Sequence, residues 1–279
     1  MSFNHTALTP NFGAKFSSVN LTYLSDDDLT SLLTDGLAQH KLLAFQNQHL
    51  NHRDLIRIVS VTGQPLHGNP ARFRVQGFPA LNIVSNIFEN GAQIGIYDGD
   101  KEEEWHCDHS FCQRIPAATL LYSVISAEFG GNTKFADTSS AFHKLSSDLL
   151  QKIEPFQALH SLMHLDSAQR KVLVEKPALD EVDTSLKAWH HLVTTSKFSG
   201  DRALLLGKSV IKDVYGGTQE NFENVIDQLE AFCFQQQYVY EHSWRDNDLV
   251  IFDNLALMHT ASPCDSKTNK RLLYRSLAV

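Results

Sequence analysis

The chain contains a histidine and a carboxylate two residues apart, and a further histidine far downstream. These are His106 and Asp108, in the segment Trp-His-Cys-Asp-His-Ser-Phe, and His259. On a β-strand, residues i and i+2 face the same side, so His106 and Asp108 can bind one ion while Cys107 points away. Two histidines and one carboxylate form the ligand set of a mononuclear non-haem iron(II) site, which leaves three coordination positions open for chemistry.

Two arginines near the end of the sequence sharpen this interpretation. Arg271 and Arg275 are separated by an even spacing, which places both on one face of a strand predicted at 271–277. A guanidinium is the natural bidentate partner of a carboxylate. Between the metal-ligand segments, Gly130 and Gly131 permit a tight turn, and Thr133 offers a hydroxyl group. We therefore expect a pocket for an acid that also chelates the metal.

The order of these segments resembles the TauD/TfdA family of iron(II)- and 2-oxoglutarate-dependent dioxygenases. The matching features are Trp-His-x-Asp-x-x-Phe, Gly-Gly-x-Thr, the run Asp-Leu-Val-Ile-Phe-Asp-Asn leading into His259, and the closing Arg-x-x-x-Arg. The resemblance implies that His106, Asp108 and His259 bind Fe(2+). It also implies that Thr133 and Arg271 bind 2-oxoglutarate, and that Arg275 belongs to the same active site with its role open.

The resemblance further implies a reaction. The enzyme would use O2 to hydroxylate, or desaturate, an unactivated C–H bond of a small polar or acidic substrate, releasing succinate and CO2. The substrate would be amino-acid-like, a sulfonate or a carboxylic acid. On the substrate side of the pocket the candidates are His67, Asn82, Tyr97 and Phe111.

Composition excludes several classes of function. Charged residues make up 20% of the 279 residues and the net charge is −8, which argues against non-specific binding of nucleic acid. We expect no membrane span, because no apolar run reaches about 18 residues. We also expect no secretory signal at the N-terminus. The four cysteines contain no Cys-x-x-Cys pair and predict free thiols, which favours the cytoplasm. The acidic runs at 26–28 and 102–104 are interpreted as solvated surface.

The predicted elements indicate a mainly β protein with flanking helices. We predict helices at 25–37, 52–61 and 220–234, and strands at 41–45, 80–87, 94–97, 119–125, 133–136, 238–242, 248–252 and 271–277. The family resemblance implies a double-stranded β-helix, a cupin-like jelly roll, as a single domain over residues 1–279. Residues 155–200 have weak periodicity and are predicted to form a lid over the active site.

Two other classes of function use similar residues. A zinc hydrolase also binds its metal through two histidines and a carboxylate, but it needs no arginine for an oxo-acid. A metal-binding jelly-roll sensor would keep the ligands without turnover. The sequence leaves the oligomeric state open, and a homo-oligomer is compatible with all three classes.

Overall fold

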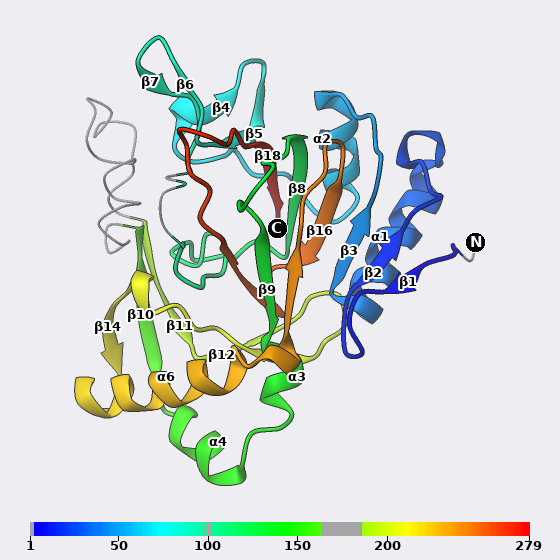
Figure 1. Ribbon diagram of the computed structural model, residues 1–279. Coiled ribbons are helices and arrows are strands. Elements are labelled where there is room, and N and C mark those ends of the chain that lie inside the picture. Colours follow the sequence, from blue (N-terminus) through cyan, green and yellow to red (C-terminus); the bar gives the residue numbers. More distant parts are fainter. Residues whose placement is uncertain (1–2, 98, 100–101, 163–185) are drawn as a thin grey trace.

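The computed structural model describes residues 3–97, 99, 102–162 and 186–279. Two β-sheets form its centre (Figure 1). The larger has eight strands in the order β1 (Thr6–Ala7), β2 (Ala14–Phe16), β3 (Leu42–Phe45), β16 (Leu249–Asp253), β8 (Ala118–Ile125), β18 (Leu272–Ala278), β5 (Phe78–Ser85) and β4 (Arg74–Val75). The smaller has three strands in the order β15 (Val239–His242), β9 (Thr133–Asp137) and β17 (Leu257–Ala261).

Alternate residues of the central strands enter two different hydrophobic cores. In β3, Leu43 and Phe45 pack in a core with the N-terminal helices, whereas Leu42 and Ala44 pack in a core that includes Phe135 of the smaller sheet. This follows from the two-residue period of a strand. Because both faces of the larger sheet are covered, these strands are continuously apolar in sequence. The two facing sheets confirm the predicted jelly roll, and the helices flank it.

Two N-terminal helices cover the outer face of the larger sheet (Figure 1). Helix α1 spans Asp26–His40, and the side chain of Ser25 caps it by accepting a hydrogen bond from the backbone N–H of Asp28. Helix α2 spans His52–Ser60 and begins with a capping box formed by Asn51 and Asp54. Leucines on one stripe of α1 pack against the sheet, as the sequence period predicts.

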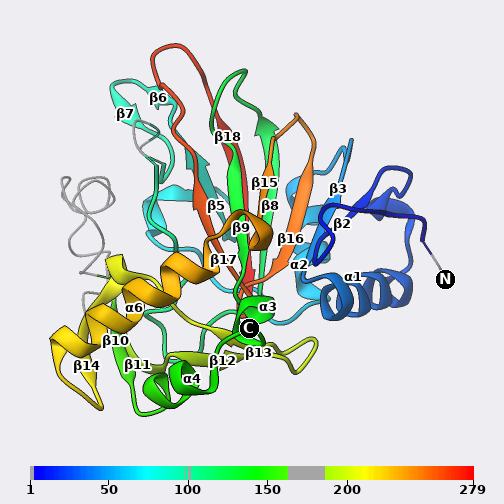
Figure 2. The same ribbon diagram turned by 60° about the horizontal axis from the view of Figure 1, so that its bottom comes forward.

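A second group of elements lies on the opposite side of the molecule from α1 (Figure 2). Helix α6 (Gln219–Cys233) packs in a core with α3 (Thr138–Phe142) and α4 (Ser147–Ile153). Beside α6 stands a sheet in the order β11 (Lys187–His191), β10 (Gln157–Ser161) and β14 (Ile211–Tyr215). Two short hairpins, β12 (Val193–Thr195) with β13 (Arg202–Leu204) and β6 (Phe88–Glu89) with β7 (Ala92–Gln93), complete the strands described.

One strand prediction is wrong, and several strands of the structure, among them β10, β11, β14 and β17, were not predicted. The strand predicted at 94–97 is wrong, because β7 ends at Gln93 and the residues that follow form no strand. Conversely, β17 was not predicted from sequence, although it carries His259. All five of its residues are buried, but they include the polar His259 and Thr260, so the segment shows neither a continuous apolar run nor the alternation of a half-exposed strand.

The predicted lid lies only partly within the described residues. Residues 163–185 lie outside them, and the flanking segments form β10 and β11, which pair antiparallel. A lid over the active site therefore stays a prediction. In the part of the chain that the structure describes, no helix is both long and apolar enough to cross a bilayer.

Candidate active site

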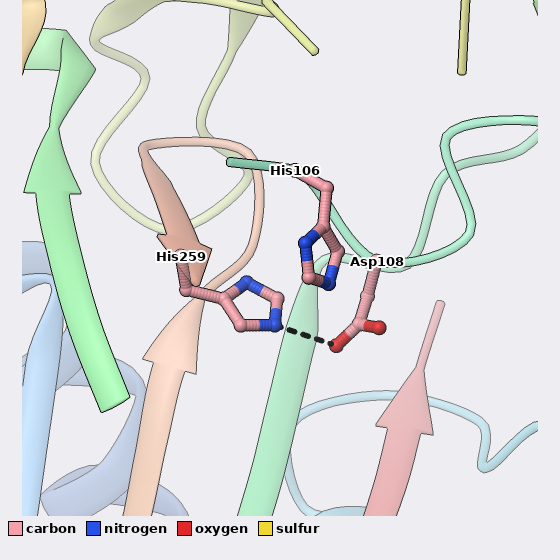
Figure 3. Close-up of side chains that lie close together, drawn as sticks. All are labelled: His106, Asp108 and His259. Atoms are coloured by element: carbon pink, nitrogen blue, oxygen red, sulfur yellow. Dashed lines mark ion pairs between the residues drawn. The ribbon is translucent and has the colours of Figure 1, made fainter. Parts of the chain in front are cut away.

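Three side chains from distant parts of the sequence converge at one end of the two sheets. His106, Asp108 and His259 each offer a ligand atom, and these atoms lie within 4.8 Å of one another (Figure 3). The Nε2 atom of His259 is 3.6 Å from Oδ2 of Asp108. Two imidazoles and one carboxylate in this arrangement are the donor set of a facial metal site. The three predicted ligands are thus brought together.

The backbone around the first two ligands is not the regular strand that the sequence predicts. His106 forms an isolated antiparallel bridge with His259, and each N–H donates to the other's carbonyl over 3.0 Å. Asp108 already lies in the turn that follows. Its position is maintained by Asn254, which accepts from the Asp108 N–H at 2.9 Å and donates to the Asp108 carbonyl at 3.0 Å. The bridge between His106 and His259 and the two hydrogen bonds between Asn254 and the Asp108 backbone therefore align the ligands in place of a regular strand.

The electrostatic environment prepares the ligands for a cation. Burial raises the pKa of Asp108, but the charges of Arg275, His259 and His106 outweigh it and hold the pKa below its ordinary value. Burial, with a further contribution from His106, lowers the pKa of His259 to about 3. At neutral pH the site therefore presents an ionised carboxylate and a neutral imidazole. These are the protonation states that metal binding requires.

Hydrogen bonding and packing orient the two imidazoles. Nδ1 of His106 lies 2.8 Å from the carbonyl oxygen of Glu104, so a proton on Nδ1 leaves the Nε2 lone pair free for a metal. The ring of His259 packs against Phe252, at a centroid distance of 5.0 Å, and against Phe135 at 6.2 Å. These contacts hold the ring with Nε2 toward Asp108. Cys107 points away from the site and packs in an apolar cluster, as expected.

A buried guanidinium with unused hydrogen-bonding capacity lies on the same side of the molecule. Arg271 is only 2% exposed, and its Nε and Nη1 atoms have no hydrogen-bond partner. Its Nη2 donates to Oγ1 of Thr133 over 3.4 Å, and its guanidinium lies 4.5 Å from the ring centre of Tyr97. Trp244 also donates to Oγ1 of Thr133, at 3.0 Å, so the hydroxyl proton of Thr133 remains free. A buried cation with unpaired donors is a site for an anion.

The two glycines before Thr133 make room for this arrangement. Gly130 and Gly131 have φ values of 73° and 66°, which side chains disfavour. A Cβ on Gly131 would lie 3.0 Å from Cδ of Arg271, and one on Gly130 would collide with the carbonyl of Pro263. The glycine pair therefore both forms the predicted turn and lets the Arg271 side chain pass.

The four substrate-side candidates have different environments. Asn82 is buried on β5 and pairs in register with Arg275 of β18, so both side chains share the inner face of the sheet. Phe111 is buried in a small apolar cluster with Leu162. Tyr97 is buried beneath Arg271, where it supports the guanidinium. His67 is exposed on the loop after α2.

Several residues that organise the site were not identified from sequence. Thr119 of β8 donates from Oγ1 to Oδ2 of Asp108 over 3.2 Å. Arg275, which was expected in the active site with its role open, pairs with Oδ1 of the same carboxylate. Asn254 and Trp244 position Asp108 and Thr133, respectively. The only sequence signal was that Asn254 belongs to the run before His259. Thr119 on β8 carries no signal, because threonine is common on strands for packing reasons, and Trp244 lies on the loop after β15.

Comparison with known families gives a match over nearly the whole chain. The model described as "Taurine catabolism dioxygenase TauD, TfdA family" matches residues 4–277.

Curated relatives cover most of the chain at low identity. An alkylsulfatase from Acinetobacter baylyi is 28% identical, over 91% of this chain and 78% of its own length. An (S)-phenoxypropionate/alpha-ketoglutarate-dioxygenase from Sphingobium herbicidovorans is 28% identical, over 99% of this chain and 94% of its own. An alpha-ketoglutarate-dependent sulfate ester dioxygenase from Pseudomonas putida is 27% identical, over 94% and 85%.

Solved structures share the fold. A taurine dioxygenase from Burkholderia xenovorans superposes with a TM-score of 0.79 and 23% identity, covering 100% of this chain and 90% of the other. The protein AAD-2, in complex with Mn(II) and N-oxalylglycine, superposes with a TM-score of 0.80 and 23% identity, covering 100% and 97%.

Proposed function

Because the chain belongs to the TauD, TfdA dioxygenase family, we propose that it binds iron(II) through His106, Asp108 and His259. We further propose that Arg271 and Thr133 bind the distal carboxylate of 2-oxoglutarate. The observation that carries this assignment is the buried Arg271 guanidinium, whose Nε and Nη1 atoms have no partner. A zinc hydrolase has no use for such a group, and neither does a sensor that only retains a metal.

The chain is an iron(II)- and 2-oxoglutarate-dependent dioxygenase that uses O2. Bound iron(II) would supply the activation of dioxygen, coupled to oxidation of 2-oxoglutarate to succinate and CO2 and to hydroxylation or desaturation at a C–H bond of the substrate. The protein's own residues provide the rest. Asp108 would offset one positive charge of the ion, and His106 and His259 would be its other two protein ligands. Arg271 and Thr133 orient the co-substrate, which lowers the entropic cost of bringing the reactants together.

We infer that the substrate is a small polar or acidic molecule, and that the reaction is hydroxylation or desaturation. The curated relatives act on sulfate esters and phenoxypropionates, as their names state. In this chain Arg275 and Asn82 share the inner face of the larger sheet, and Phe111 offers an apolar surface. Arg275 supports an acidic group on the substrate. We also propose a cytoplasmic location, since all four cysteines are free thiols and a reducing compartment suits a ferrous ion.

Binding of the co-substrate tests the proposal directly. Calorimetry on Mn(II)-loaded protein should show binding of 2-oxoglutarate, with much weaker binding of glutarate, which lacks the chelating keto oxygen. The iron(II) form should then release succinate only when O2 and 2-oxoglutarate are both present. Equal affinity for glutarate and 2-oxoglutarate, or hydrolytic activity of the zinc form without 2-oxoglutarate, would contradict it.

A further inference from the structure

The acidic run before the metal ligands does not lie entirely in solvent. Glu102 and Glu104 are exposed, as the sequence predicts, and Oε1 of Glu102 pairs with Nζ of Lys134 at 2.5 Å. Glu103 between them is half-buried. The three adjacent carboxylates therefore have different environments. The prediction that this run is solvated surface holds for Glu102 and Glu104 but not for Glu103.

An irregular register explains why Glu103 turns inward. The N–H of Glu103 donates to the carbonyl of Ala261, and the N–H of His106 donates to that of His259, both at 3.0 Å. Between these two hydrogen bonds the first segment advances by three residues, from Glu103 to His106, whereas β17 covers only two, from His259 to Ala261. One extra residue in a pair of strands is a β-bulge. Beyond the bulge, the side chains that would have faced one side of the pair face the other side. A regular strand would have placed Glu104 on the face of His106; the bulge places Glu103 there.

The inner face of β17 leads from the metal ligands to the anion pocket. His259 and Ala261 share that face, and Ala261 packs in a cluster with Tyr97, whose ring lies beneath the Arg271 guanidinium. The opposite face carries Thr260, which pairs in register with Lys134, the partner of Glu102. Glu103 therefore lies beside the route between the metal site and Arg271.

The charges around Glu103 agree with this position. Its electrostatic neighbours are His106, Arg271, Arg275 and Asp108, all of them groups of the proposed active site. Reciprocally, Glu103 is among the groups that act on Arg271. No described residue forms a hydrogen bond or an ion pair with the Glu103 carboxylate, which leaves it available to a ligand.

Charge balance indicates what ligand this carboxylate favours. The carboxylates of Asp108 and Glu103 balance the guanidiniums of Arg271 and Arg275. A divalent ion is balanced by the two carboxylates of 2-oxoglutarate. The loaded site is then neutral, and Arg271 is occupied by the co-substrate. Glu103 is then half-buried and, among the described residues, has no partner, which is unfavourable unless a cation joins it.

We propose that Glu103 makes the site selective for substrates that carry an ammonium or similar cationic group. Arg275 is held by Asp108 through Nη1, and its Nε, which has no partner among the described residues, is left for an acidic group of the same molecule. The substrate class is then a zwitterion, such as an amino acid or an amino sulfonate, rather than a simple anion. This inference rests on the proposed function. It assigns to Glu103 both an attraction for the cation and a repulsion of substrates that are anionic only.

Matched pairs of small acids with and without an amine test the proposal. The probes are δ-aminovalerate with valerate, β-alanine with propionate, and taurine with ethanesulfonate. Calorimetry on the Mn(II) and 2-oxoglutarate complex should show that the best-bound amino compound is preferred over its partner by about tenfold or more. Glu103→Gln should abolish that preference. Glu102→Gln, a change at the neighbouring exposed carboxylate that pairs with Lys134, should keep it.

The co-substrate supplies an independent measurement. Because the negative charge of Glu103 acts on Arg271, Glu103→Gln should tighten binding of 2-oxoglutarate to the Mn(II) protein several-fold, whereas Glu102→Gln should leave it unchanged. The proposal is overturned if wild-type protein prefers the compounds without an amine or shows no preference, or if both variants behave alike. Failure of the wild-type protein to bind 2-oxoglutarate is a different result, which contradicts the proposed function instead.

Discussion

Arg275 donates a hydrogen bond from Nη1 to Oδ1 of Asp108 over 2.6 Å. The carboxylate assigned to the metal is thus already paired with a guanidinium from β18, while its other oxygen accepts from Thr119 and lies near His259. The Asp108 side chain is 2% exposed, so these partners, and not water, keep it ionised. Arg275 therefore links β18, which begins directly after the co-substrate arginine Arg271, to the metal ligands.

Removal of this partner should change the pH dependence of metal binding. Arg275 lowers the pKa of Asp108, so Arg275→Gln should raise that pKa, and protons should compete with the metal at higher pH. We expect the midpoint of metal loss on acidification to move upward by about one pH unit. Calorimetric titration with Mn(II) over a series of pH values measures it. Arg275→Lys keeps the charge and should move the midpoint less; identical midpoints in all three proteins would contradict the assigned role.

Loss of the carboxylate itself should be more severe. Asp108→Ala removes the anionic ligand and leaves Arg275 close to two histidines without a counter-charge, so metal binding and turnover should both be lost. Succinate release and metal content report the two effects. Asp227→Ala, which removes an exposed acid paired with Lys208, is the control and should behave as wild type. Near-normal succinate formation coupled to product in Asp108→Ala would refute the ligand assignment.

The proposed role of Arg271 in binding 2-oxoglutarate leads to a quantitative prediction. Arg271→Ala should raise the KM for 2-oxoglutarate roughly a hundredfold, which corresponds to about 2.7 kcal/mol for a charge-assisted bidentate pair. The free protein should not lose stability in proportion, because two nitrogens of this buried guanidinium have no partner to lose. Arg57→Ala, at a partly exposed arginine paired with Asp26, is a control for loss of charge. An unchanged KM would remove Arg271 from this role.

A buried histidine in the sheet beside α6 should make the fold sensitive to acid. His160 is fully buried with Nδ1 3.0 Å from Oγ of Ser110, and burial lowers its pKa to about 3, from an ordinary value near 6.5. The unfolded chain binds a proton below about pH 6.5, whereas the folded protein does not until about pH 3, so stability falls as the pH is lowered through this window. The contribution from His160 is about 2 kcal/mol at pH 5.

Urea unfolding of metal-free protein at pH 8 and pH 5 measures this effect. Between pH 8 and pH 5, the free energy of unfolding of His160→Gln should fall by about 2 kcal/mol less than that of the wild-type protein. His143→Gln, at an exposed histidine, should leave the difference unchanged. Equal losses in wild type and His160→Gln would show that His160 does not remain neutral in the folded protein.

Local patterns predicted much of the architecture. The leucine stripe and the Ser25 cap of α1 are determined within a few residues of sequence, and the helix forms where they indicate. The central strands were recognised as short apolar runs. β17 was missed because two of its buried residues, His259 and Thr260, are polar, so the segment is neither a continuous apolar run nor an alternating one. The apolar run at 94–97 resembled a strand but finds no regular partner, and pairing is a property of the whole fold.

The amino-acid sequence alone determined which groups could bind the metal and the co-substrate, because residue type and order along the chain carry that chemistry. Only the tertiary structure decided that Arg275 pairs with Asp108, that Asn254 clamps the turn, and that Glu103 rather than Glu104 faces the site. These relationships depend on strand register and burial. A single inserted residue in a pairing register reverses the direction of a side chain, and burial is set by segments far away in the chain.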